Sequence, residues 1–415
     1  MAVVGEVRYR SLDQVDPAGR RVAVRIDLNA SIDPQTGRVQ PNERFRAHVI
    51  TIRELMSRGA RIVLLAHQGR RGDPDFTDLS QHAEILSQLA EREIRFIPDV
   101  AGEEAVRAIK GLQRGEAILL DNVRKLEDED LEKPPEEHAK STLPSKLAPH
   151  LDIFVLDAFS VAHRSHASVV GLAALLPTYA GRVMERELEA LNRLVARTDK
   201  IVFILGGNKP KECLNVLRRF AVERKSAILE VLTGGVVGQL FAKTRGHSLG
   251  APSEEFLAQK KHLDLLKTVS EIDATLREVI RIPSDFAYEA DGRGREEIPL
   301  SRLPCPGLIQ DIGGATIREY CGVIGRLGRE VTIIVKGPMG VYEKPAFRKG
   351  TQELYMALAK ARASTLIGGG DSVTAIELLG LRPSDFTYVS LGGGALISYL
   401  SGEPMPGLQV LSRTI

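Results

Sequence analysis

The chain has 415 residues, more than one hydrophobic core usually supports, so its length predicts about two or three domains, and the different motifs of its two halves favour two. Its 56 basic and 54 acidic residues leave a formal charge of +2, which argues against the broad basic surface of a protein that binds nucleic acid or anionic membranes. No apolar run reaches the roughly 20 residues of a membrane span, and the three widely spaced cysteines fit neither a disulfide framework nor a zinc site, so we expect a folded cytoplasmic protein.

In the first half of the chain, four short apolar runs predict buried strands, and each run ends in polar residues. The runs begin at Val22, Ile62, Ala117 and Ile153. Runs of four to six apolar residues without strict alternation are typical of strands covered on both faces. Helical patterns at residues 42–58 and 79–92 lie between strands, and this alternation predicts a parallel α/β sheet.

Five arginines lie within or just after these strand-end motifs: Arg25, Arg44, Arg70, Arg124 and Arg164. Ligands of an open parallel sheet bind beyond the carboxyl ends of its strands, so we expect the five guanidinium groups to converge on one rim. Guanidinium groups bind phosphate and carboxylate oxygens through paired hydrogen bonds, so the rim predicts a small, highly charged anion as ligand.

Three histidines, His67, His163 and His166, extend this predicted rim. No nucleophile motif and no metal-binding spacing of histidines accompanies them. We therefore favour histidines that bind oxyanions over the alternative, histidines that act as general bases.

Two segments in the middle of the chain bear on its domain organisation. The highly charged, proline-containing segment 125–147 is predicted to be a surface excursion. Residues 183–196 have strong helix propensity and are predicted to join the domains as a stiff helix. We expect residues 1–180 to form the first domain and residues 181–399 the second, with a tail, 400–415, that packs back on the first; the stretch 401–408 of this tail is predicted not to be helical.

In the second half of the chain, the predicted strands end in glycine: Gly206-Gly207, Gly234-Gly235, Gly368-Gly369-Gly370 and Gly392-Gly393-Gly394. Bare backbone at four strand ends lets N–H groups and helix N-termini meet phosphate oxygens, so nucleotide phosphates are the predicted ligand. Neither the P-loop nor the dinucleotide-binding consensus occurs at these strand ends. Asp371 can hold Mg²⁺ or cap the helix that follows it. Residues 288–303 are expected to form a long loop.

Seven segments carry a resemblance to a known family. They are Arg25-Ile26-Asp27-Leu28-Asn29, His67-Gln68-Gly69-Arg70, Asp157-Ala158-Phe159 with His163-Arg164, Leu205-Gly206-Gly207-Asn208-Lys209, Gly337-Pro338-Met339-Gly340-Val341-Tyr342-Glu343, Gly368-Gly369-Gly370-Asp371-Ser372, and Ser390-Leu391-Gly392-Gly393-Gly394-Ala395. Their order and spacing resemble phosphoglycerate kinase, and most of all its archaeal branch, over nearly the whole chain.

This resemblance implies an α/β fold of two Rossmann-like parallel-sheet domains with helices on both faces, an interdomain helix, and a cleft that closes between the domains. It also implies the reversible transfer of a phosphoryl group between ATP and 3-phospho-D-glycerate, with Mg²⁺ on the nucleotide. The residues implied to bind 3-phosphoglycerate are Asp27, Leu28, Asn29, Arg44, His67, Gln68, Gly69, Arg70, Arg124 and Arg164.

The residues implied to bind the nucleotide are Gly206, Gly207, Lys209, Glu343, Gly369, Gly370, Asp371 and Ser372, with Glu343 at the ribose and Asp371 also at the metal. The resemblance implies that the transferring phosphoryl group contacts Arg44, Lys209, Gly370 and Gly393. We expect a monomer, with a homodimer as the alternative, and neither a nucleic-acid nor a membrane partner.

Four residues depart from the usual family pattern: Ser31 in place of proline, Cys213 in place of a lysine, Lys336 in place of asparagine and Leu391 in place of threonine. These departures leave two alternatives open beside the leading hypothesis. One is a diverged paralogue that phosphorylates another carboxylate. The other is a regulatory protein that binds nucleotide without turnover.

Overall fold

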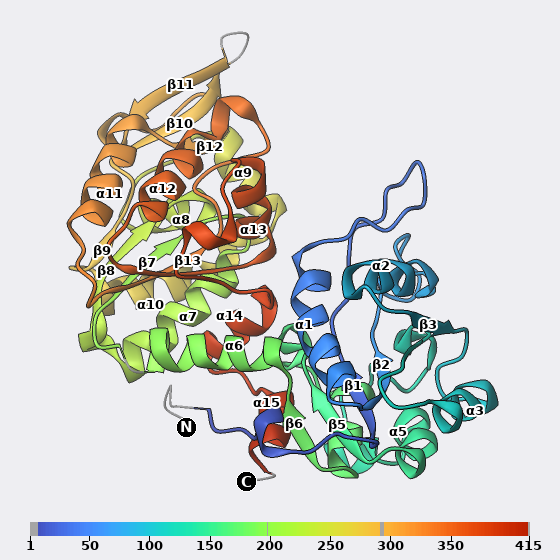
Figure 1. Ribbon diagram of the computed structural model, residues 1–415. Helices are drawn as coiled ribbons and strands as arrows, with labels where there is room; N and C mark the ends of the chain where they lie inside the picture. Colours follow the sequence, from blue (N-terminus) through green and yellow to red (C-terminus); the bar gives the residue numbers. More distant parts are fainter. Residues whose placement is uncertain (1–6, 197, 291–293, 414–415) are drawn as a thin grey trace. The chain divides into compact units, whose positions relative to one another are not determined.

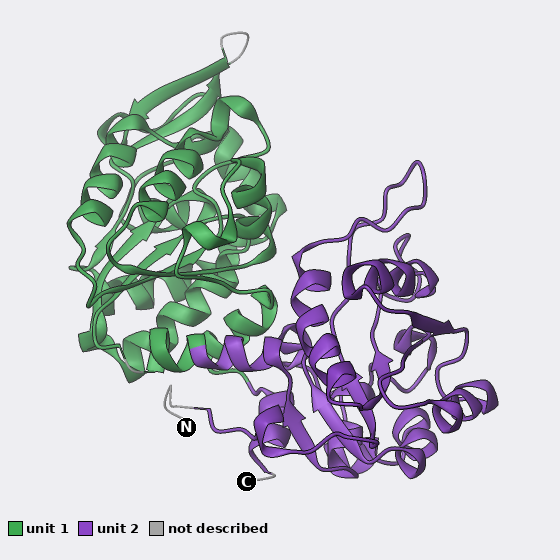
Figure 2. Cartoon of the chain, viewed as in Figure 1, with its two compact units in different colours: residues 1–6, 190–403 green, residues 7–189, 404–415 purple. Residues whose placement is uncertain are grey.

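The computed structural model describes residues 7–196, 198–290 and 294–413, which form two compact units (Figures 1 and 2). Residues 7–189 and the described part of 404–415 make up one of them, here called the N-terminal unit and purple in Figure 2. Residues 190–403 make up the C-terminal unit, which is green. Each unit has its own parallel sheet.

The N-terminal unit contains a six-stranded sheet in the order β3-β4-β2-β1-β5-β6, and every neighbouring pair is parallel. The strands are β1 (Arg21–Arg25), β2 (Arg61–Leu65), β3 (Ile94–Ile97), β4 (Ala117–Leu120), β5 (Ile153–Leu156) and β6 (Thr178–Ala180). The four predicted strands of this half are confirmed as β1, β2, β4 and β5. The sequence analysis did not identify the two edge strands, β3 and β6.

The helices of this unit are α1 (Glu43–Ser57), α2 (Ser80–Ala90), α3 (Glu103–Gly111), α4 (Pro135–His138), α5 (Thr142–Leu147), α6 (Arg182–Leu191) and α15 (Pro406–Ser412). The predicted helices 42–58 and 79–92 are confirmed as α1 and α2. Asn42 caps α1, because its side chain accepts a hydrogen bond from the backbone N–H of Arg44. This cap fixes Arg44 in the first turn of the helix.

Two predictions about the N-terminal unit were wrong. The segment 125–147 is not a surface excursion, because it contains α4 and α5 and because the side chains of Glu129 and His138 are fully buried. The tail is partly helical, since α15 begins at Pro406, and the backbone N–H of Gly407 donates to the carbonyl of Ala162 at 2.8 Å.

The C-terminal unit contains a second six-stranded parallel sheet, in the order β15-β14-β13-β7-β8-β9. Its strands are β7 (Ile201–Leu205), β8 (Ile228–Thr233), β9 (Ile280–Arg281), β13 (Thr332–Lys336), β14 (Ser364–Gly368) and β15 (Tyr388–Val389). Four of them, β7, β8, β14 and β15, were predicted. The central position of β13 beside β7 places the segment that begins at Gly337 next to the glycines that follow β7.

A three-stranded antiparallel sheet, in the order β11-β10-β12, adds to this unit. Its strands are β10 (Asp285–Ala290), β11 (Gly294–Pro299) and β12 (Ile309–Ile312). The prediction of a long loop at 288–303 was therefore wrong, apart from residues 291–293, which lie outside the described residues. The polar residues of β11 belong to an edge strand, where side chains face solvent.

The helices of the C-terminal unit are α7 (Pro210–Glu223), α8 (Gly235–Thr244), α9 (Ala251–Gln259), α10 (Leu266–Leu276), α11 (Gly314–Arg326), α12 (Lys349–Ala359), α13 (Gly370–Leu378) and α14 (Gly393–Ser401). Helices α11 and α12 pack against each other, and α7 packs against both α10 and α14. The prediction of an α/β fold with two parallel sheets flanked by helices is confirmed. No helix in the described ranges has the length and apolar character to cross a membrane.

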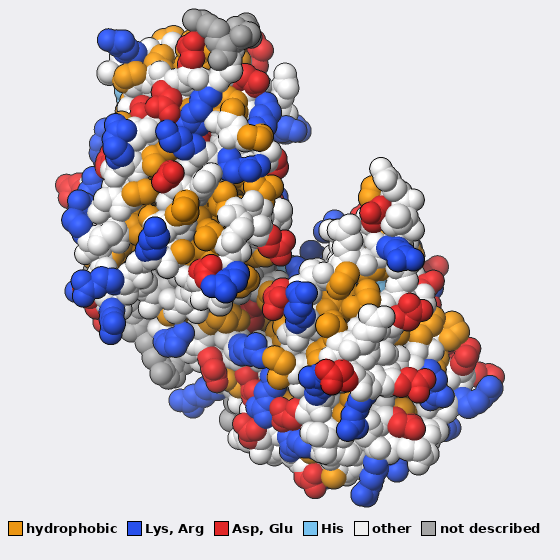
Figure 3. Space-filling view, turned by 45° about the horizontal axis from the view of Figure 1, so that its top comes forward, with side chains coloured by type: hydrophobic (Ala, Val, Ile, Leu, Met, Phe, Trp, Pro, Cys, Tyr) orange, Lys and Arg blue, Asp and Glu red, His pale blue; other side chains and the backbone are white. Residues whose placement is uncertain are grey.

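Both sheets are buried between helices, as their apolar runs predicted. Phe45 of α1 packs in one core with Val24 and Leu64 of the N-terminal sheet, and all three are fully buried. Burial of each side chain of this kind contributes about 1.5–3 kcal/mol. Basic and acidic side chains are interspersed on the face shown in Figure 3, as the small net charge leads one to expect.

The glycines that follow β7 allow a close contact with the segment after β13. The backbone N–H of Gly207 donates to the carbonyl of Pro338 at 2.7 Å, and a methyl group on Gly206 would overlap that same carbonyl oxygen. The Gly206→Ala substitution is therefore expected to lower the free energy of unfolding by about 1–3 kcal/mol, because the loop must move to relieve the overlap. Chemical denaturation measures this loss.

The matched control is Gly325→Ala in the exposed part of α11, where an added methyl group meets no atom within 4 Å. Alanine is favoured over glycine in a helix by roughly 0.5–1 kcal/mol, so this variant is expected to be at least as stable as the parent. Equal stability of Gly206→Ala and Gly325→Ala would contradict the close contact.

Candidate active site

The N-terminal unit has a hollow of about 260 Å³ at the carboxyl ends of β1, β2, β4 and β5, here called the anion hollow. Its walls combine cationic, acidic and polar side chains with backbone: Asp27, Asn29, Arg44, His67, Gly69, Arg70, Asp73, Asp75, Arg124, Ser160, Val161, His163 and Arg164. Four of the five predicted arginines therefore lie together. Most of its residues come from the loops and helical turns that follow these strands.

Arg25 is the arginine that does not line the anion hollow, so its prediction as a rim residue was wrong. It is the last residue of β1, and only 1% of its surface is exposed. Its Nε donates to the Ser168 hydroxyl at 2.8 Å, and one terminal nitrogen lies 3.2 Å from Nδ1 of His67. Arg25 thus supports His67 from below.

The contact with Arg25 defines the hydrogen-bonding role of His67. Since a guanidinium group only donates, Nδ1 of His67 accepts, and the ring proton resides on Nε2. Burial and the neighbouring Arg25 charge hold the pKa of His67 well below its usual value. His67 is therefore a neutral donor that lines the anion hollow, in keeping with a role in binding oxyanions.

The other two histidines occupy different positions. His163 lines the anion hollow, whereas His166 is buried and does not. Burial and the nearby Arg164 charge lower the pKa of His166 to about 3, although its Nε2 lies 3.4 Å from a carboxylate oxygen of Glu132. His166 is accordingly neutral and forms part of the wall behind the hollow.

Asp27 is the buried anion in this cationic site. Its carboxylate accepts from the Ser160 hydroxyl at 2.5 Å and from the backbone N–H of Asn29 at 2.9 Å, and it lies 3.3 Å from Arg44. Burial opposes its ionisation, but Arg44 and these hydrogen bonds outweigh burial and lower its pKa. Asp27 is therefore an ionised acceptor that holds Arg44 in place.

A chain of hydrogen bonds also connects Asp27 to the start of α6. The backbone N–H of Asp27 donates to Nε2 of His48, and Nδ1 of His48 donates to Asp157 at 2.9 Å. The other oxygen of Asp157 accepts from the backbone N–H of Val183 at 2.8 Å. Asp157 thus anchors a helix and does not itself line the hollow.

Two of the residues predicted to bind 3-phosphoglycerate, Leu28 and Gln68, are fully buried and do not line the anion hollow. The Gln68 amide exchanges hydrogen bonds with the backbone of Ala30 at 2.9 Å and donates to the carbonyl of Asp75. Asn29 accepts from the backbone N–H of Gly69 at 2.9 Å. Gln68 therefore ties together the loops that present the lining residues.

The arginines of the hollow repel one another. Burial, followed by the charges of Arg164 and Arg70, lowers the pKa of Arg124. Beneath them lies Glu129, whose carboxylate accepts from the Ser168 hydroxyl at 2.5 Å. Burial raises the pKa of Glu129 to about 7, and Arg25 opposes this rise. The concentration of positive charge makes the hollow a site for a polyanion.

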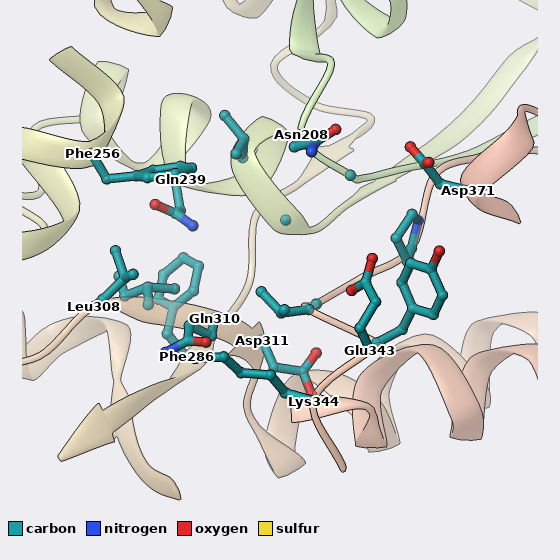
Figure 4. A pocket seen from close by; sticks show the side chains of 18 residues that line it. Asn208, Gln239, Phe256, Phe286, Leu308, Gln310, Asp311, Glu343, Lys344 and Asp371 are labelled. Carbon is teal, nitrogen blue, oxygen red and sulfur yellow. The ribbon is translucent and has the colours of Figure 1, made fainter. Parts of the chain in front are cut away.

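The C-terminal unit has an elongated cavity of about 480 Å³ at the carboxyl ends of β7, β8 and β13, here called the C-terminal cavity (Figure 4). At one end lie Asn208, Glu343 and Asp371, and at the other lie the apolar side chains of Phe256 and Leu308. One polar end and one apolar end suit a ligand with a charged part and a flat, apolar part.

Of the residues predicted to bind nucleotide, Gly207, Glu343 and Asp371 line this cavity. Lys209 lies beside it, with its Nζ 3.9 Å from a carboxylate oxygen of Asp371. Ser372 does not line the cavity, because it is fully buried and its hydroxyl accepts from the backbone N–H of Gly337 at 3.0 Å.

The remaining predicted residues, Gly206, Gly369, Gly370 and Gly393, surround the N-termini of helices. Helices α7, α8, α13 and α14 all begin at strand ends of this unit, and no N-cap side chain accepts a hydrogen bond from any of them. A Cβ atom on Gly393 would lie 2.7 Å from Cα of Gly369, so two of these helix starts are adjacent. Uncapped N–H groups and helix dipoles bind phosphate.

Two of the four departures from the family pattern lie in this region. Lys336 is buried at the end of β13, under Gly369, and forms an ion pair with Glu212 at 2.9 Å. Cys213 is fully buried, and burial raises the pKa of its thiol to about 12. Lys336 thus brings a positive charge close to the glycine turn.

Sequence reasoning missed Ser160, Gln239, Phe256 and Phe286. Ser160 follows the predicted strand end at Asp157 by three residues, so this spacing could have placed it near the rim. Gln239 follows Gly235 by four residues on α8 and shares its helix face, a spacing that the sequence also shows. Phe256 and Phe286 reach the cavity from elements beyond the parallel sheet, so no strand-end rule identifies them.

The sequence profile of the family described as phosphoglycerate kinase matches residues 12–403. The chain belongs to the phosphoglycerate kinase family. The phosphoglycerate kinase of Methanopyrus kandleri is 40% identical, over 97% of this chain and 97% of that protein. The phosphoglycerate kinase of Methanothermobacter thermautotrophicus is 39% identical, over 100% of this chain and 99% of that protein.

Solved structures of phosphoglycerate kinases are similar to the chain over almost its full length. The crystal structure from Pyrococcus horikoshii has a TM-score of 0.88 at 36% identity and covers 98% of this chain and 99% of its own. The structure from Coxiella burnetii has a TM-score of 0.80 at 27% identity with the same coverage. The resemblance that the sequence motifs indicated is confirmed, and so is the fold.

In this member of the phosphoglycerate kinase family, His82 supports the anion hollow from behind. Its ring is fully buried, stacks on Phe45 with centroids 5.7 Å apart, and lies 3.2 Å from Gln68 Oε1. Burial lowers the pKa of His82 to about 4, so the ring is neutral in the folded protein. Acid must therefore destabilise the fold, because the unfolded state gains this proton below about pH 6.5 and the folded state only near pH 4.

When the pH falls from 7 to 5, His82 gains a proton in the unfolded state but not in the folded state. This difference is expected to lower the free energy of unfolding of the parent by about 2 kcal/mol. The His82→Gln variant cannot gain this charge, so its loss over the same interval is expected to be smaller by that amount. Urea denaturation at the two pH values makes the comparison. An unchanged pH dependence in His82→Gln would contradict the neutral, buried histidine.

Proposed function

We propose that the protein transfers a phosphoryl group reversibly between MgATP and 3-phospho-D-glycerate, giving ADP and 1,3-bisphosphoglycerate. The observation that carries the proposal is the presence of two anion sites of different construction. The anion hollow offers charged guanidinium groups, and the C-terminal cavity offers backbone N–H groups beside an apolar slot. A small phosphorylated acid suits the first site, and a nucleotide suits the second.

In the proposed complex, 3-phosphoglycerate binds in the anion hollow. Arg70, Arg124 and Arg164 supply paired hydrogen bonds to its phosphate oxygens. Asp27 and Asn29 face the same space and are assigned to the polar groups of the substrate. His67 donates from Nε2. Leu28 and Gln68 are assigned a supporting role in the loops that carry the lining residues, and Gly69 lines the hollow with its backbone.

The nucleotide is proposed to occupy the C-terminal cavity. Its phosphates would lie at Gly207 and at the helix starts after Gly206, Gly369 and Gly370, with Lys209 as a mobile cation beside them. Glu343 is assigned to the ribose hydroxyl groups, since its carboxylate faces the middle of the cavity (Figure 4). Ser372 is assigned to the support of the loop at Gly337.

Asp371 fits a magnesium ion carried by the nucleotide. Its carboxylate is accessible, faces the polar end of the cavity and has only a long contact with Lys209. No cluster of three metal-binding side chains occurs in the described part of the chain, and Mg²⁺ is usually held by one or two carboxylates together with phosphates and water. When bound, the ion neutralises phosphate charge during the transfer.

The chemistry needs positioning and charge more than an activated side chain. The substrate supplies the nucleophile, its carboxylate in one direction and an ADP phosphate oxygen in the other. The two bound ligands must be brought into contact during turnover. Arg44, Lys209 and the helix N-termini at Gly370 and Gly393 are assigned to the transferring phosphoryl group, where they offset the charge of the transition state.

A steady-state assay of ATP-dependent phosphorylation of 3-phosphoglycerate tests the proposal, with a chelator of Mg²⁺ as the control. We expect turnover that requires both substrates and that stops on chelation. Turnover with another carboxylic acid in preference to 3-phosphoglycerate would instead favour a diverged paralogue. Binding of both ligands without turnover would favour a regulatory protein.

The Arg44→Ala variant is expected to lose turnover by tenfold or more, because its guanidinium group is assigned to the transferring phosphoryl group. Each tenfold loss equals about 1.4 kcal/mol of activation barrier. Its affinity for MgADP is expected to stay within about twofold of the parent, as calorimetry can show. Equal losses of turnover and of MgADP affinity would contradict this assignment.

Arg46→Ala is the matched control for Arg44→Ala. Arg46 lies two residues further along α1, is exposed, and forms its ion pair with Glu43 rather than with a residue of the hollow. Exposed ion pairs contribute about 0–1 kcal/mol to stability. Arg46→Ala is therefore expected to keep the parent's turnover.

The Asp371→Ala variant is expected to bind MgADP about tenfold more weakly and 3-phosphoglycerate with unchanged affinity. The reason is that Asp371 is assigned to the metal and lies in the other unit from the anion hollow. Separate calorimetric titrations with each ligand make the test, and Glu377→Ala on the same helix serves as the control. A matching loss of 3-phosphoglycerate affinity would refute the assignment.

A further inference from the structure

Gln239 lines the C-terminal cavity with a carboxamide that the protein leaves incompletely bonded. The residue is 4% exposed, and its Oε1 is enclosed and accepts no hydrogen bond from any described residue. The second amide at this end of the cavity differs, because Nε2 of Gln310 donates to Glu289. Buried polar atoms of folded proteins nearly always have a partner, so a missing one at a ligand cavity indicates that the ligand supplies it.

The position of Gln239 defines which part of a ligand it can reach. Gly235, Val236 and Gln239 line the cavity from one face of α8, and Gln239 is one helical turn further from the glycine-rich start. Figure 4 shows its amide directed into the cavity between Phe256 and Gln310, at the end away from Asp371. The part of a nucleotide furthest from its phosphates is the base.

The chemistry of a carboxamide matches one edge of a purine. Its donor and acceptor lie side by side, and they can pair with the group at position 6 of the base and with the ring nitrogen beside it. Rotation of the amide exchanges donor and acceptor, so a 6-amino purine and a 6-oxo purine both find a partner. A purine with hydrogen at position 6 leaves the amide oxygen without one.

We propose that Gln239 determines base specificity in the C-terminal cavity by hydrogen bonding to the substituent at position 6 of a purine. This inference rests on the proposed function, in which the cavity binds the nucleotide. It predicts that adenine and hypoxanthine nucleotides both bind, and that a purine without a 6-substituent binds more weakly.

Calorimetric titration of the full-length protein with three magnesium nucleotides tests the proposal: ADP, inosine diphosphate and purine riboside 5′-diphosphate. We expect ADP and inosine diphosphate to have dissociation constants within about threefold of each other. Purine riboside diphosphate is expected to bind about tenfold more weakly than ADP, since it lacks one buried hydrogen bond.

The Gln239→Met variant keeps the length of the side chain and removes the amide. Its affinities for ADP and for purine riboside diphosphate are expected to differ by about twofold or less. Gln310→Met is the matched control, because the amide of Gln310 is engaged with Glu289. That control is expected to keep the tenfold preference of the parent for ADP.

Three results would overturn the inference. They are equal binding of ADP and purine riboside diphosphate by the parent, a full ADP preference in Gln239→Met, and loss of the preference in Gln310→Met to the same extent as in Gln239→Met. The parent's titrations do not depend on the folding of any variant. Failure of the parent to bind any of the three nucleotides would refute the proposed function as well, which separates the two failures.

Discussion

Repulsion among the guanidinium groups of the anion hollow is the main constraint on the structure of the N-terminal unit. Burial lowers the pKa of Arg124, and the charges of the nearby Arg164 and Arg70 lower it further. The unit offsets this repulsion with the ionised carboxylate of Asp27 in the wall, and Glu129 beneath it, whose pKa burial raises to about 7, adds negative charge as it ionises. It also keeps His67 and His166 neutral, so that neither ring adds further positive charge. The hollow therefore retains cationic groups that suit an anionic ligand, whose negative charge would offset the remaining repulsion among the arginines.

The C-terminal unit differs from the N-terminal unit, because its proposed anion-binding groups are backbone N–H groups and not charged side chains. The groups proposed to bind its ligand are backbone N–H groups at helix starts, and these carry partial charges that need no counterion. Glycines make this possible, because a side chain on Gly206 or Gly393 would collide with neighbouring backbone. Fixed dipoles suit the proposed nucleotide, and Lys209 beside the cavity is proposed to add charge at the point of transfer.

The predicted positions of site residues were most accurate for residues that follow a strand. Arg70, Arg124 and Arg164 lie in loops beyond the ends of parallel strands, and a parallel sheet necessarily gathers such loops at one edge. Arg25 still belongs to its strand, so its side chain points into the layer between sheet and helix and is buried. Burial of Glu129 depends on a partner, Ser168, that lies 39 residues away, and no local pattern indicates such a pairing. The edge strand at 294–299 was missed because its polar residues resemble those of a loop. The orientation of Gln239 required side-chain coordinates.

The most direct test of the account is a crystal structure of the protein with 3-phosphoglycerate and MgADP. The account predicts that the phosphate of 3-phosphoglycerate is hydrogen bonded to at least two of Arg70, Arg124 and Arg164. It also predicts that the ADP phosphates lie against the N-terminus of α13, with the base beside Gln239 and Phe256. Binding of 3-phosphoglycerate outside the anion hollow, or of the ADP phosphates away from these helix starts, would contradict it.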